Sequence, residues 1–328
     1  MRNILVVGGA GYIGSHMVKL LLECGHEVTT LDNLSTGHAD AVLGGELIKG
    51  DLADREFLRT VFSNRRFDAV MHFASSIEVG ESVTDPAKYY RNNVANTLNL
   101  LDSMVQAGVR QFIFSSTAAV YGLPRETPIG ETHPTEPLNP YGRTKLVVER
   151  ALEDYERAYG LKSVCFRYFN AAGADPSGKL GERHDPESHL IPRVLQAASG
   201  RLAEFKVFGT DYETPDGTCI RDYVHVSDLC NAHLAGLDHL FRTRQSHRFN
   251  LGNGNGYSVK EVIETAHRIT GRTFPVQYGP RRAGDPPRLV ADSALARRDL
   301  GWKPRYPELR TIIEHAWKFE LTQKDREW

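Results

Sequence analysis

Tyr141 and Lys145 are the two side chains whose types and spacing most clearly suggest catalysis. They are four residues apart, so on a helix they share one face and the ammonium can approach the phenol. A tyrosine with its ordinary pKa of about 10 is a poor base at neutral pH, and lowering that pKa by about three units takes roughly 4 kcal/mol of phenolate stabilisation. We expect the neighbouring ammonium to contribute to this lowering. Taken alone, the pair also fits a helix-start tyrosine followed by a solvated lysine, so the elements around it must decide.

Two predicted elements would position this pair. A proline-rich loop precedes residues 141–145, and a long helix is predicted over residues 146–159. Thr117 stands just beyond an apolar run that ends at Ser115, so its hydroxyl is available at a strand end to relay or orient a proton. A base, an ammonium and a hydroxyl are therefore expected at one edge of a sheet.

The first residues of the chain predict a strand, a tight turn, a helix and a second strand. The turn carries Gly8, Gly11 and Gly14, and the second strand ends at Asp32. Gly8 allows the sharp turn, Gly11 removes a Cβ where a pyrophosphate approaches the backbone, and Gly14 lets helix and strand pack closely. The helix N-terminus favours the anion. Asp32 can accept both hydroxyls of an adenosine ribose and would repel a 2′-phosphate, which favours NAD over NADP.

Alternation of strand and helix patterns continues along the chain. Strand-like runs at residues 47–49, 69–73, 111–115 and 163–169 alternate with helical patterns at 55–62 and 90–106. This predicts an α/β fold with a doubly wound parallel sheet, the Rossmann arrangement, whose ligands gather at the carboxyl ends of the strands. From about residue 173 glycine, proline, aspartate and histidine dominate, which predicts a smaller second α/β lobe. A helix at 190–199 belongs to it, while 226–252 is expected to return to the first domain.

Composition narrows the function classes. The chain has 328 residues, with 40 basic and 41 acidic side chains and a net charge of −1, which argues against a nucleic-acid partner. Four cysteines are scattered without a C-x-x-C pair, so we expect neither a disulfide framework nor a metal site. No apolar stretch approaches the length of a membrane span, so we expect a cytoplasmic protein with no membrane partner.

Eight motifs, in their order and spacing, resemble the UDP-glucose 4-epimerases of the extended short-chain dehydrogenase/reductase family. They are Gly8 to Gly14, His72-Phe73-Ala74, Asn92-Asn93-Val94, Ser115 to Gly122, Tyr141 to Lys145, Arg167-Tyr168-Phe169-Asn170, Arg221 to Val226 and Arg281 to Asp285. The likeness covers nearly the whole chain. It implies an isomerase that holds NAD and interconverts UDP-galactose and UDP-glucose through a 4-keto intermediate, with transient hydride transfer to the bound cofactor. The alternative is a 4-epimerase of another UDP-sugar: UDP-N-acetylglucosamine, UDP-xylose or UDP-glucuronate.

Ala118 and Ala119 argue for epimerisation over a related reaction. Nucleotide-sugar dehydratases of the same family carry an acidic pair at this place. Two methyl groups can neither donate nor accept a proton, so the acid and base needed to eliminate water are missing there.

The resemblance also implies the remaining site residues. The implied catalytic residues are Tyr141, Lys145 and Thr117. The implied cofactor contacts are Gly8, Gly11, Tyr12, Ile13, Gly14, Asp32, Asn33, Asp51, Leu52, Phe73, Ala74, Asn92, Ser115, Tyr141, Lys145 and Tyr168. The implied substrate contacts are Thr117, Tyr141, Phe169, Asn170, His189, Leu190, Lys206, Val207, Phe208, Arg221, Arg282 and Asp285. Residues 1–172 would then form the NAD-binding domain and 173–328 the smaller UDP-sugar-binding domain.

Individual roles follow from the same resemblance. Arg221 and Arg282 resemble a diphosphate clamp, which guanidinium geometry suits, and Asp285 a ribose contact. Residues 206–208 resemble a shelf for uracil, while 169 and 170 line the sugar end. Asp51 has a rival interpretation as the cap of the helix that follows it.

Three positions depart from the family pattern or leave it open. Ile77 stands where some members have a lysine that reaches the cofactor, and His189 where some have an asparagine near the phosphates. Leu289 occupies the gate beside the sugar 2-position, where tyrosine excludes N-acetylated sugars and a small residue admits them. Because leucine is intermediate in size, we expect a preference for UDP-glucose and UDP-galactose with weak activity on UDP-N-acetylglucosamine.

The helices at 90–106 and 146–159 carry apolar residues on more than one face. These are Val94, Leu98, Leu101, Val148, Leu152 and Tyr155. Exposed apolar area of this kind predicts a homodimer built on a four-helix bundle. A regulator that had kept the fold and lost catalysis would be expected to lack the pair at 141 and 145.

Overall fold

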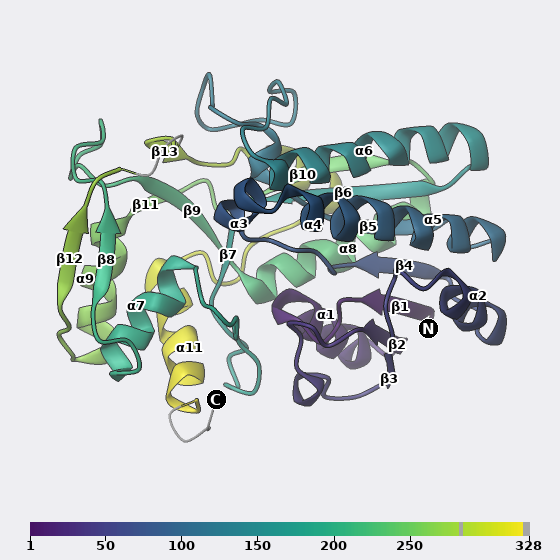
Figure 1. Cartoon of the computed structure of the whole chain (residues 1–328), viewed down its shortest axis with the longest axis horizontal. Coiled ribbons are helices and arrows are strands. Elements are labelled where there is room, and N and C mark those ends of the chain that lie inside the picture. Colours follow the sequence, from purple (N-terminus) through teal and green to yellow (C-terminus); the bar gives the residue numbers. More distant parts are fainter. Residues whose placement is uncertain (282–284, 324–328) are drawn as a thin grey trace.

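A computed structural model describes residues 1–281 and 285–323. Its larger part is a seven-stranded sheet in which every neighbouring pair is parallel (Figure 1). The strands are β1 (Asn3–Val7), β2 (Glu27–Asp32), β3 (Glu46–Lys49), β4 (Ala69–His72), β5 (Gln111–Thr117), β6 (Lys162–Tyr168) and β10 (His247–Leu251). Their order is β10-β6-β5-β4-β1-β2-β3, so the direction of winding reverses between β1 and β4. The predicted doubly wound fold is confirmed, and its carboxyl edge at this reversal is where such sheets bind ligands.

Helices cover both faces of the sheet. Helices α1 (Tyr12–Glu23) and α8 (Val226–Thr243) pack on one face, and α2 (Arg55–Asn64), α5 (Asn96–Gln106) and α6 (Pro140–Tyr159) pack on the other. Side chains of a strand alternate between the faces, so Ile4 and Val6 join the first core while Leu5 and Val7 join the second. All four are fully buried, as expected for a sheet covered on both sides.

The helix predicted over residues 90–106 is divided. Two short helices, α3 (Val79–Thr84) and α4 (Pro86–Tyr89), lead into a π-helical segment at Tyr90–Ala95, and α5 begins only at Asn96. Wide turns of this kind occur often at functional sites. This one turns the side chains of Asn92 and Asn93 toward the loop after β4.

The smaller lobe surrounds a second sheet (Figure 1). Strand β9 (Ile220–His225) pairs with β11 (Gly256–Ser258), β13 (Arg288–Leu289) and β7 (Asn170–Ala172). A separate ribbon joins β8 (Phe205–Phe208) to β12 (Val276–Gly279). Helices α7 (Leu190–Ser199), α9 (Val259–Thr270) and α11 (Leu309–Leu321) enclose the apolar core of this lobe.

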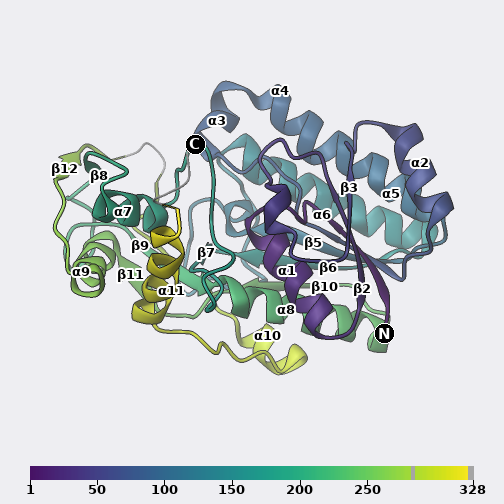
Figure 2. The same ribbon diagram turned by 90° about the horizontal axis from the view of Figure 1, so that it is seen from below.

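Segments that are late in the sequence also pack against the large sheet (Figure 2). Besides α8 and β10, the short helix α10 (Ala294–Leu300) contributes Ala296 to the core beneath α8. Trp302, just after α10, is buried in the same core and its ring nitrogen donates to the carbonyl of Asp228 at 2.9 Å. The division into residues 1–172 and 173–328 remains a prediction.

Candidate active site

The turn between β1 and α1 shows why its three glycines differ. Gly8 has a φ of +78°, and a Cβ there would collide with the backbone of Ala74. A Cβ on Gly14 would collide with the carbonyl oxygen of Gly8. At Gly11, by contrast, the nearest atom to an added Cβ is that same oxygen at 3.4 Å, an ordinary contact. The chain's own packing therefore requires Gly8 and Gly14, whereas the missing Cβ of Gly11 leaves open space at the start of α1.

The first turn of α1 is suited to an anion. The first N–H groups of a helix have no partner within it, and Gly11 at the N-cap supplies no side chain to accept from them. Tyr12 and Ile13 are the first two residues of α1, and the hydroxyl of Tyr12 is used elsewhere, donating to the carbonyl of Gly173 at 2.7 Å. Backbone N–H groups and the positive end of the helix dipole therefore face the space that Gly11 opens.

Asp32 ends β2 directly beside this turn. One carboxylate oxygen accepts from the N–H of Ala10 at 2.9 Å and the other from the N–H of Leu34 at 2.8 Å. The side chain is buried and held in place, and each oxygen keeps a second lone pair. That geometry fits recognition of two ribose hydroxyls.

Asn33 and Asp51 are brought together next to Asp32. The amide of Asn33 donates to Asp51 at 2.8 Å, and the other oxygen of Asp51 accepts from the N–H of Ala53 at 2.8 Å. The cap of α2 is Asp54, whose side chain accepts from the N–H of Phe57 at 2.9 Å. The rival interpretation of Asp51 as a helix cap is therefore wrong.

The first turn of α6 carries Tyr141. Asn139 caps it by accepting from the N–H of Gly142 at 2.9 Å, and Pro140 occupies its first position. A Cβ on Gly142 would collide with the carbonyl of Ala119, so the start of α6 lies directly against the chain that follows β5. Strand β5 runs two residues further than predicted, which makes Thr117 its last residue, and the hydroxyl of Thr117 is hydrogen-bonded to the Tyr141 phenol.

Lys145 lies one turn further along α6 and is 1% exposed. Its ammonium donates to the hydroxyl of Ser75 and to the carbonyl of Ser115, both at 2.7 Å. Burial lowers the pKa of Lys145 to about 7, with the Glu149 carboxylate acting in the opposite direction. The amine is therefore held at the ends of β4 and β5 and can change its charge near neutral pH.

The electrostatics around Tyr141 differ from the expectation. Removal of water raises the pKa of this phenol to about 12, the hydrogen bond from Thr117 lowers it, and the charge of Glu78 raises it. Among the described residues no hydrogen bond joins Lys145 to Tyr141, because the ammonium is engaged by Ser75 and Ser115. In the chain without NAD, the prediction that a direct contact with the Lys145 ammonium lowers the pKa of Tyr141 is wrong.

Other predicted cofactor residues lie along the same edge of the sheet. Phe73 and Ala74 follow β4, and Ala74 contacts the glycine turn at Gly8. The hydroxyl of Tyr168, at the end of β6, donates to the side chain of Ser115. Leu52 is buried after β3, and its carbonyl accepts from Asn99 of α5 at 3.1 Å.

The second lobe brings several predicted substrate residues together. Arg221 donates to the carboxylate of Asp285 and to the carbonyl of Pro286, the latter at 3.0 Å. Phe169 and Leu289 pack on one apolar cluster, formed by Ala118, Val120, Tyr121, Ile129 and Leu146. The predicted gate therefore lies beside the end of β5. Arg282 lies outside the described residues.

The remaining predicted substrate residues are spread over β7, α7 and β8. Asn170 donates its amide to the carbonyl of Asp222 at 3.0 Å, which fixes β7 beside β9. His189 and Leu190 begin α7. Within β8, Val207 is buried in the core of the lobe. Lys206 and Phe208, on either side of it in the strand, lie together, with the ammonium of Lys206 5.4 Å from the ring centre of Phe208. Figure 1 shows β8 on the far side of the lobe from the large sheet.

Comparisons with known proteins agree with this arrangement. The family described as "NAD dependent epimerase/dehydratase family" matches residues 4–252. This chain belongs to that family.

Relatives and solved structures extend the likeness over nearly the full length. The chain is 54% identical over 316 residues to a UDP-glucose 4-epimerase of Halalkalibacterium halodurans, covering 96% of this chain and 95% of that protein. A crystal structure of UDP-glucose 4-epimerase from Brucella ovis in complex with NAD has a TM-score of 0.95 at 53% identity, covering 98% of this chain and 99% of that one. The enzyme from Bifidobacterium longum, in complex with NAD+ and UDP, has a TM-score of 0.93 at 39% identity and covers 98% of both chains.

Three residues beyond the predicted set contact the predicted site residues or connect the segments that carry them. Ser75 accepts from Lys145, as described above. Asn93 is buried, accepts from the N–H of Ser76 at 2.8 Å, and donates to the side chain of Thr144 at 3.2 Å. It therefore fastens the loop after β4 to α6. Glu78 accepts from the hydroxyl of Ser188 at 2.6 Å and so connects that loop to the second lobe.

Two of these residues could have been suspected from the sequence, because they stand next to motif residues. Ser75 follows His72-Phe73-Ala74 and Asn93 follows Asn92, but only the fold shows which neighbours they contact. Asn92 itself donates to the side chain of Ser76 at 3.2 Å. For Glu78 we find no sequence signal.

Proposed function

We propose that this family member is a UDP-glucose 4-epimerase, which interconverts UDP-galactose and UDP-glucose with NAD as its cofactor. The observation that carries the proposal is the phenol of Tyr141, hydrogen-bonded to Thr117 at the carboxyl edge of the sheet, with the buried amine of Lys145 one turn away. A base that is positioned beside a dinucleotide site is the arrangement that oxidation and reduction of a sugar hydroxyl needs.

The residues of the β1–α1 turn fit NAD. The open space at Gly11, the N–H groups at the start of α1 and the carboxylate of Asp32 suit a diphosphate and a ribose with free hydroxyls. Asn33 and Asp51 would extend the site toward the adenine, and Ser115, Lys145 and Tyr168 toward the nicotinamide. When bound, NAD supplies a reversible acceptor for the hydride of the sugar C4.

In the proposed reaction Tyr141 takes the proton from the 4-hydroxyl and later returns it to the same oxygen, whereas the hydride would return to the opposite face of C4. Thr117 orients that phenol. Lys145 adds positive charge at the same edge when it is protonated, and its pKa of about 7 makes both charge states accessible at neutral pH. Ala118 belongs to the apolar cluster on which Phe169 packs, so no acid at this place competes by eliminating water.

Epimerisation also needs a firm hold on the nucleotide and a loose hold on the hexose, because the sugar must present both faces. The pair formed by Arg221 and Asp285 supports a site for the ribose and diphosphate. Phe169 and Leu289 present an apolar wall at the sugar end, which confines a hexose without fixing its hydroxyls. Leu289 supports a preference for UDP-glucose and UDP-galactose over N-acetylated sugars.

A homodimer is a further part of the proposal, with a corrected set of contact residues. Leu101, Val148 and Leu152 are buried in the core of the chain itself and leave no face for a partner. Tyr90 and Val147, on the outer side of the same helical layer, remain 41% and 40% exposed. Sedimentation as a monomer at micromolar concentration would contradict the dimer.

The location of the protein is proposed to be cytoplasmic, supported by its four free cysteines. None of the helices within residues 1–281 and 285–323 has both the length and the apolar character that crossing a membrane requires.

Conversion of UDP-galactose tests the proposal. The purified protein is incubated with UDP-galactose without added NAD, and UDP-glucose is quantified by chromatography. We expect conversion to an equilibrium mixture. If neither this incubation nor one with added NAD yields UDP-glucose, the proposal is refuted, and parallel incubations with UDP-N-acetylglucosamine, UDP-xylose and UDP-glucuronate identify another substrate.

A further inference from the structure

Four potential metal ligands meet in the segment that enters α7. Glu182, His184, Glu187 and His189 lie within eight consecutive residues, and one ligand atom from each lies within 4.8 Å of all the others. We propose that these four side chains form a binding site for one Zn²⁺ ion. His189 is also among the predicted substrate contacts, but zinc binding is tested without substrate, so its outcome does not depend on the epimerase function.

The distances within this cluster, here called the 182–189 cluster, suit a tetrahedral ion. Nδ1 of His184 is 3.2 Å from Oε1 of Glu182 and 3.7 Å from Oε1 of Glu187, and Nδ1 of His189 is 3.9 Å from Oε1 of Glu187. Zinc bonds to nitrogen and oxygen of about 2.0–2.1 Å in a tetrahedron place the ligand atoms roughly 3.3 Å apart. Nδ1 of His189 is also hydrogen-bonded to Oε1 of Glu182. Because the four ligand atoms lie within 4.8 Å of one another, zinc would need to draw the most distant pair together by up to about 1.5 Å and to replace this hydrogen bond.

One nitrogen of the cluster has no hydrogen-bond partner. Nδ1 of His184 is buried and makes no hydrogen bond to any described residue, although it lies near two carboxylate oxygens. Its contact with Glu182 therefore has the distance of a polar contact without the direction of a hydrogen bond. Two ligand atoms that point toward a shared centre produce this geometry, because their lone pairs meet at the ion and not at each other.

Burial and charge also favour a divalent cation. The side chains of Glu182 and Glu187 are each 4% exposed, and an uncompensated buried carboxylate is costly. Among the described residues, the two imidazoles are the only ion-pair partners of these carboxylates. Arg183 points elsewhere and pairs with Asp40. Without an ion, burial lowers the pKa of both imidazoles but the carboxylates raise it by more, so two imidazolium charges balance the two carboxylates. A zinc ion would displace those two protons and balance the same formal charge of −2.

The ligand set selects the metal. Two imidazoles with two carboxylates suit Zn²⁺, whereas Mg²⁺ and Ca²⁺ prefer oxygen ligands alone. The compact spacing on one loop favours a four-coordinate site whose role is structural.

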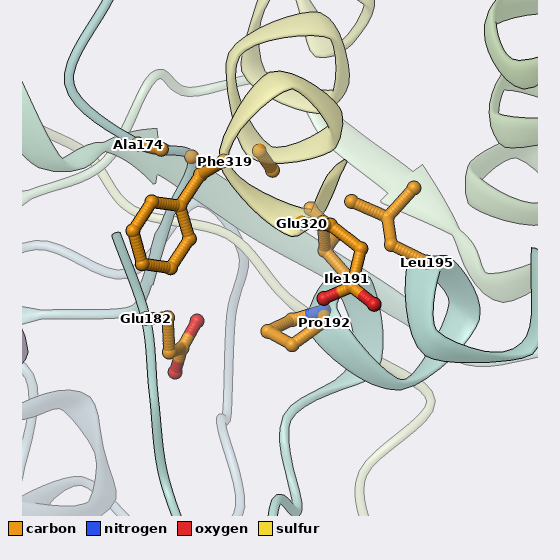
Figure 3. Close-up of a pocket in the computed structure, with 9 residues that line it drawn as sticks. Ala174, Glu182, Ile191, Pro192, Leu195, Phe319 and Glu320 are labelled. Atoms are coloured by element: carbon orange, nitrogen blue, oxygen red, sulfur yellow. The ribbon is translucent and has the colours of Figure 1, made fainter. Parts of the chain in front are cut away.

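The surroundings indicate what such an ion would hold together. The ring of His184 lies against Tyr12 at the start of α1, with 6.4 Å between the ring centres. Ser188, between two of the ligands, donates to Glu78 in the loop after β4. Figure 3 shows Glu182 at the wall of a small pocket of about 20 Å³, where Ile191 of α7 and Phe319 of α11 also lie. An ion here would fix the entry to α7 against both the large sheet and α11.

Zinc binding to the full chain tests the proposal directly. The protein, without a histidine tag, is treated with EDTA, desalted and titrated with zinc sulfate in a calorimeter. We expect one ion per chain and a melting temperature that rises with zinc and falls again with EDTA. Cobalt(II) should bind at the same site and give the intense visible absorption of a tetrahedral ion.

Matched double variants locate the ion. His184→Gln with Glu187→Gln removes an imidazole and a carboxylate three residues apart, and should weaken zinc binding by at least a hundredfold. His267→Gln with Glu264→Gln removes a pair of the same types and spacing from α9 and should bind zinc like the parent chain. If the first variant fails to fold, Glu182→Gln alone reports the same loss. The absence of zinc binding by the parent, or equal affinity of the two double variants, would overturn the proposal.

Discussion

Replacement of Lys145 by methionine should separate stability from catalysis. The ammonium is buried, donates to Ser75 and Ser115, and has a pKa that burial lowers from 10.5 to about 7. Methionine has a similar length and carries no charge. The variant should lose turnover, because the amine at the edge of the sheet is gone, while the fold no longer has to accommodate a buried charge.

The size of the effect follows from the two pKa values. A pKa difference of about 3.5, at about 1.4 kcal/mol per pH unit, destabilises the folded chain by about 5 kcal/mol at low pH. The unfolded chain binds this proton between pH 7 and 10.5 and the folded chain does not, so the stability of the parent rises with pH in that window. Between pH 7 and pH 9 the rise should be about 2 kcal/mol.

Urea unfolding of the cofactor-free proteins at pH 7 and pH 9 measures this rise. The free energy of unfolding of the methionine variant, relative to the parent, should fall by about 2 kcal/mol from pH 7 to pH 9. The lost hydrogen bonds cancel from this comparison because they contribute equally at both values. Lys303→Met, at an exposed position, is the control and should show no such change. A difference that stays constant with pH would refute the reasoning.

Three further substitutions test separate parts of the structure. Gly14→Ala should destabilise the fold by about 1–3 kcal/mol in thermal unfolding, because the added Cβ would collide with the carbonyl oxygen of Gly8. Gly11→Ala should mainly weaken NAD binding, measured by calorimetric titration. An equal loss of stability in the two variants would contradict this. Arg167→Met should cost about 3 kcal/mol in urea unfolding, since it removes the buried partner of the Glu149 carboxylate. Among the described residues, that carboxylate then keeps only Ser116 and the partly exposed Arg248, the latter at 3.2 Å. A loss below about 1 kcal/mol would argue against that role of Arg167. Leu289→Tyr should lower turnover of UDP-N-acetylglucosamine relative to UDP-glucose, and an unchanged ratio of kcat/KM would remove Leu289 from the substrate gate.

The sequence predicts best the features that arise from a regular pattern of residues or from a steric limit between residues close in the chain. The α/β fold class and the family are confirmed, since strand and helix patterns alternate and the glycine spacing at residues 8, 11 and 14 reflects steric limits that act within a few residues. Helix α7 begins and ends as predicted, because its apolar spacing is regular and Gly200 ends it.

Contacts between distant segments could not be predicted in the same way. Lys145 and Ser75 are 70 residues apart, and Arg221 and Asp285 are 64 apart. The sequence shows which residue type stands at each position. Which of these residues contact one another depends on how β4, α6 and the second lobe pack together. The raised pKa of Tyr141 has the same origin, because it depends on burial that is set by the whole fold.

The 182–189 cluster was missed for a different reason. The scattered cysteines give no sign of a metal site, whereas the candidate ligands are histidines and glutamates on one loop. Their spacing is visible in the sequence, but exposed histidines and glutamates are common. The 4% exposure of both carboxylates and the convergence of the four ligand atoms distinguish this group, and both are set by the fold.

The turnover of Tyr141→Phe tests the central claim most directly. The substitution removes one hydroxyl, and Tyr155→Phe on the same helix is the matched control. With UDP-galactose as substrate, we predict that kcat of Tyr141→Phe falls by roughly 10²–10⁴ while NAD stays bound and Tyr155→Phe keeps near-parental turnover. Near-parental turnover of Tyr141→Phe would contradict the account.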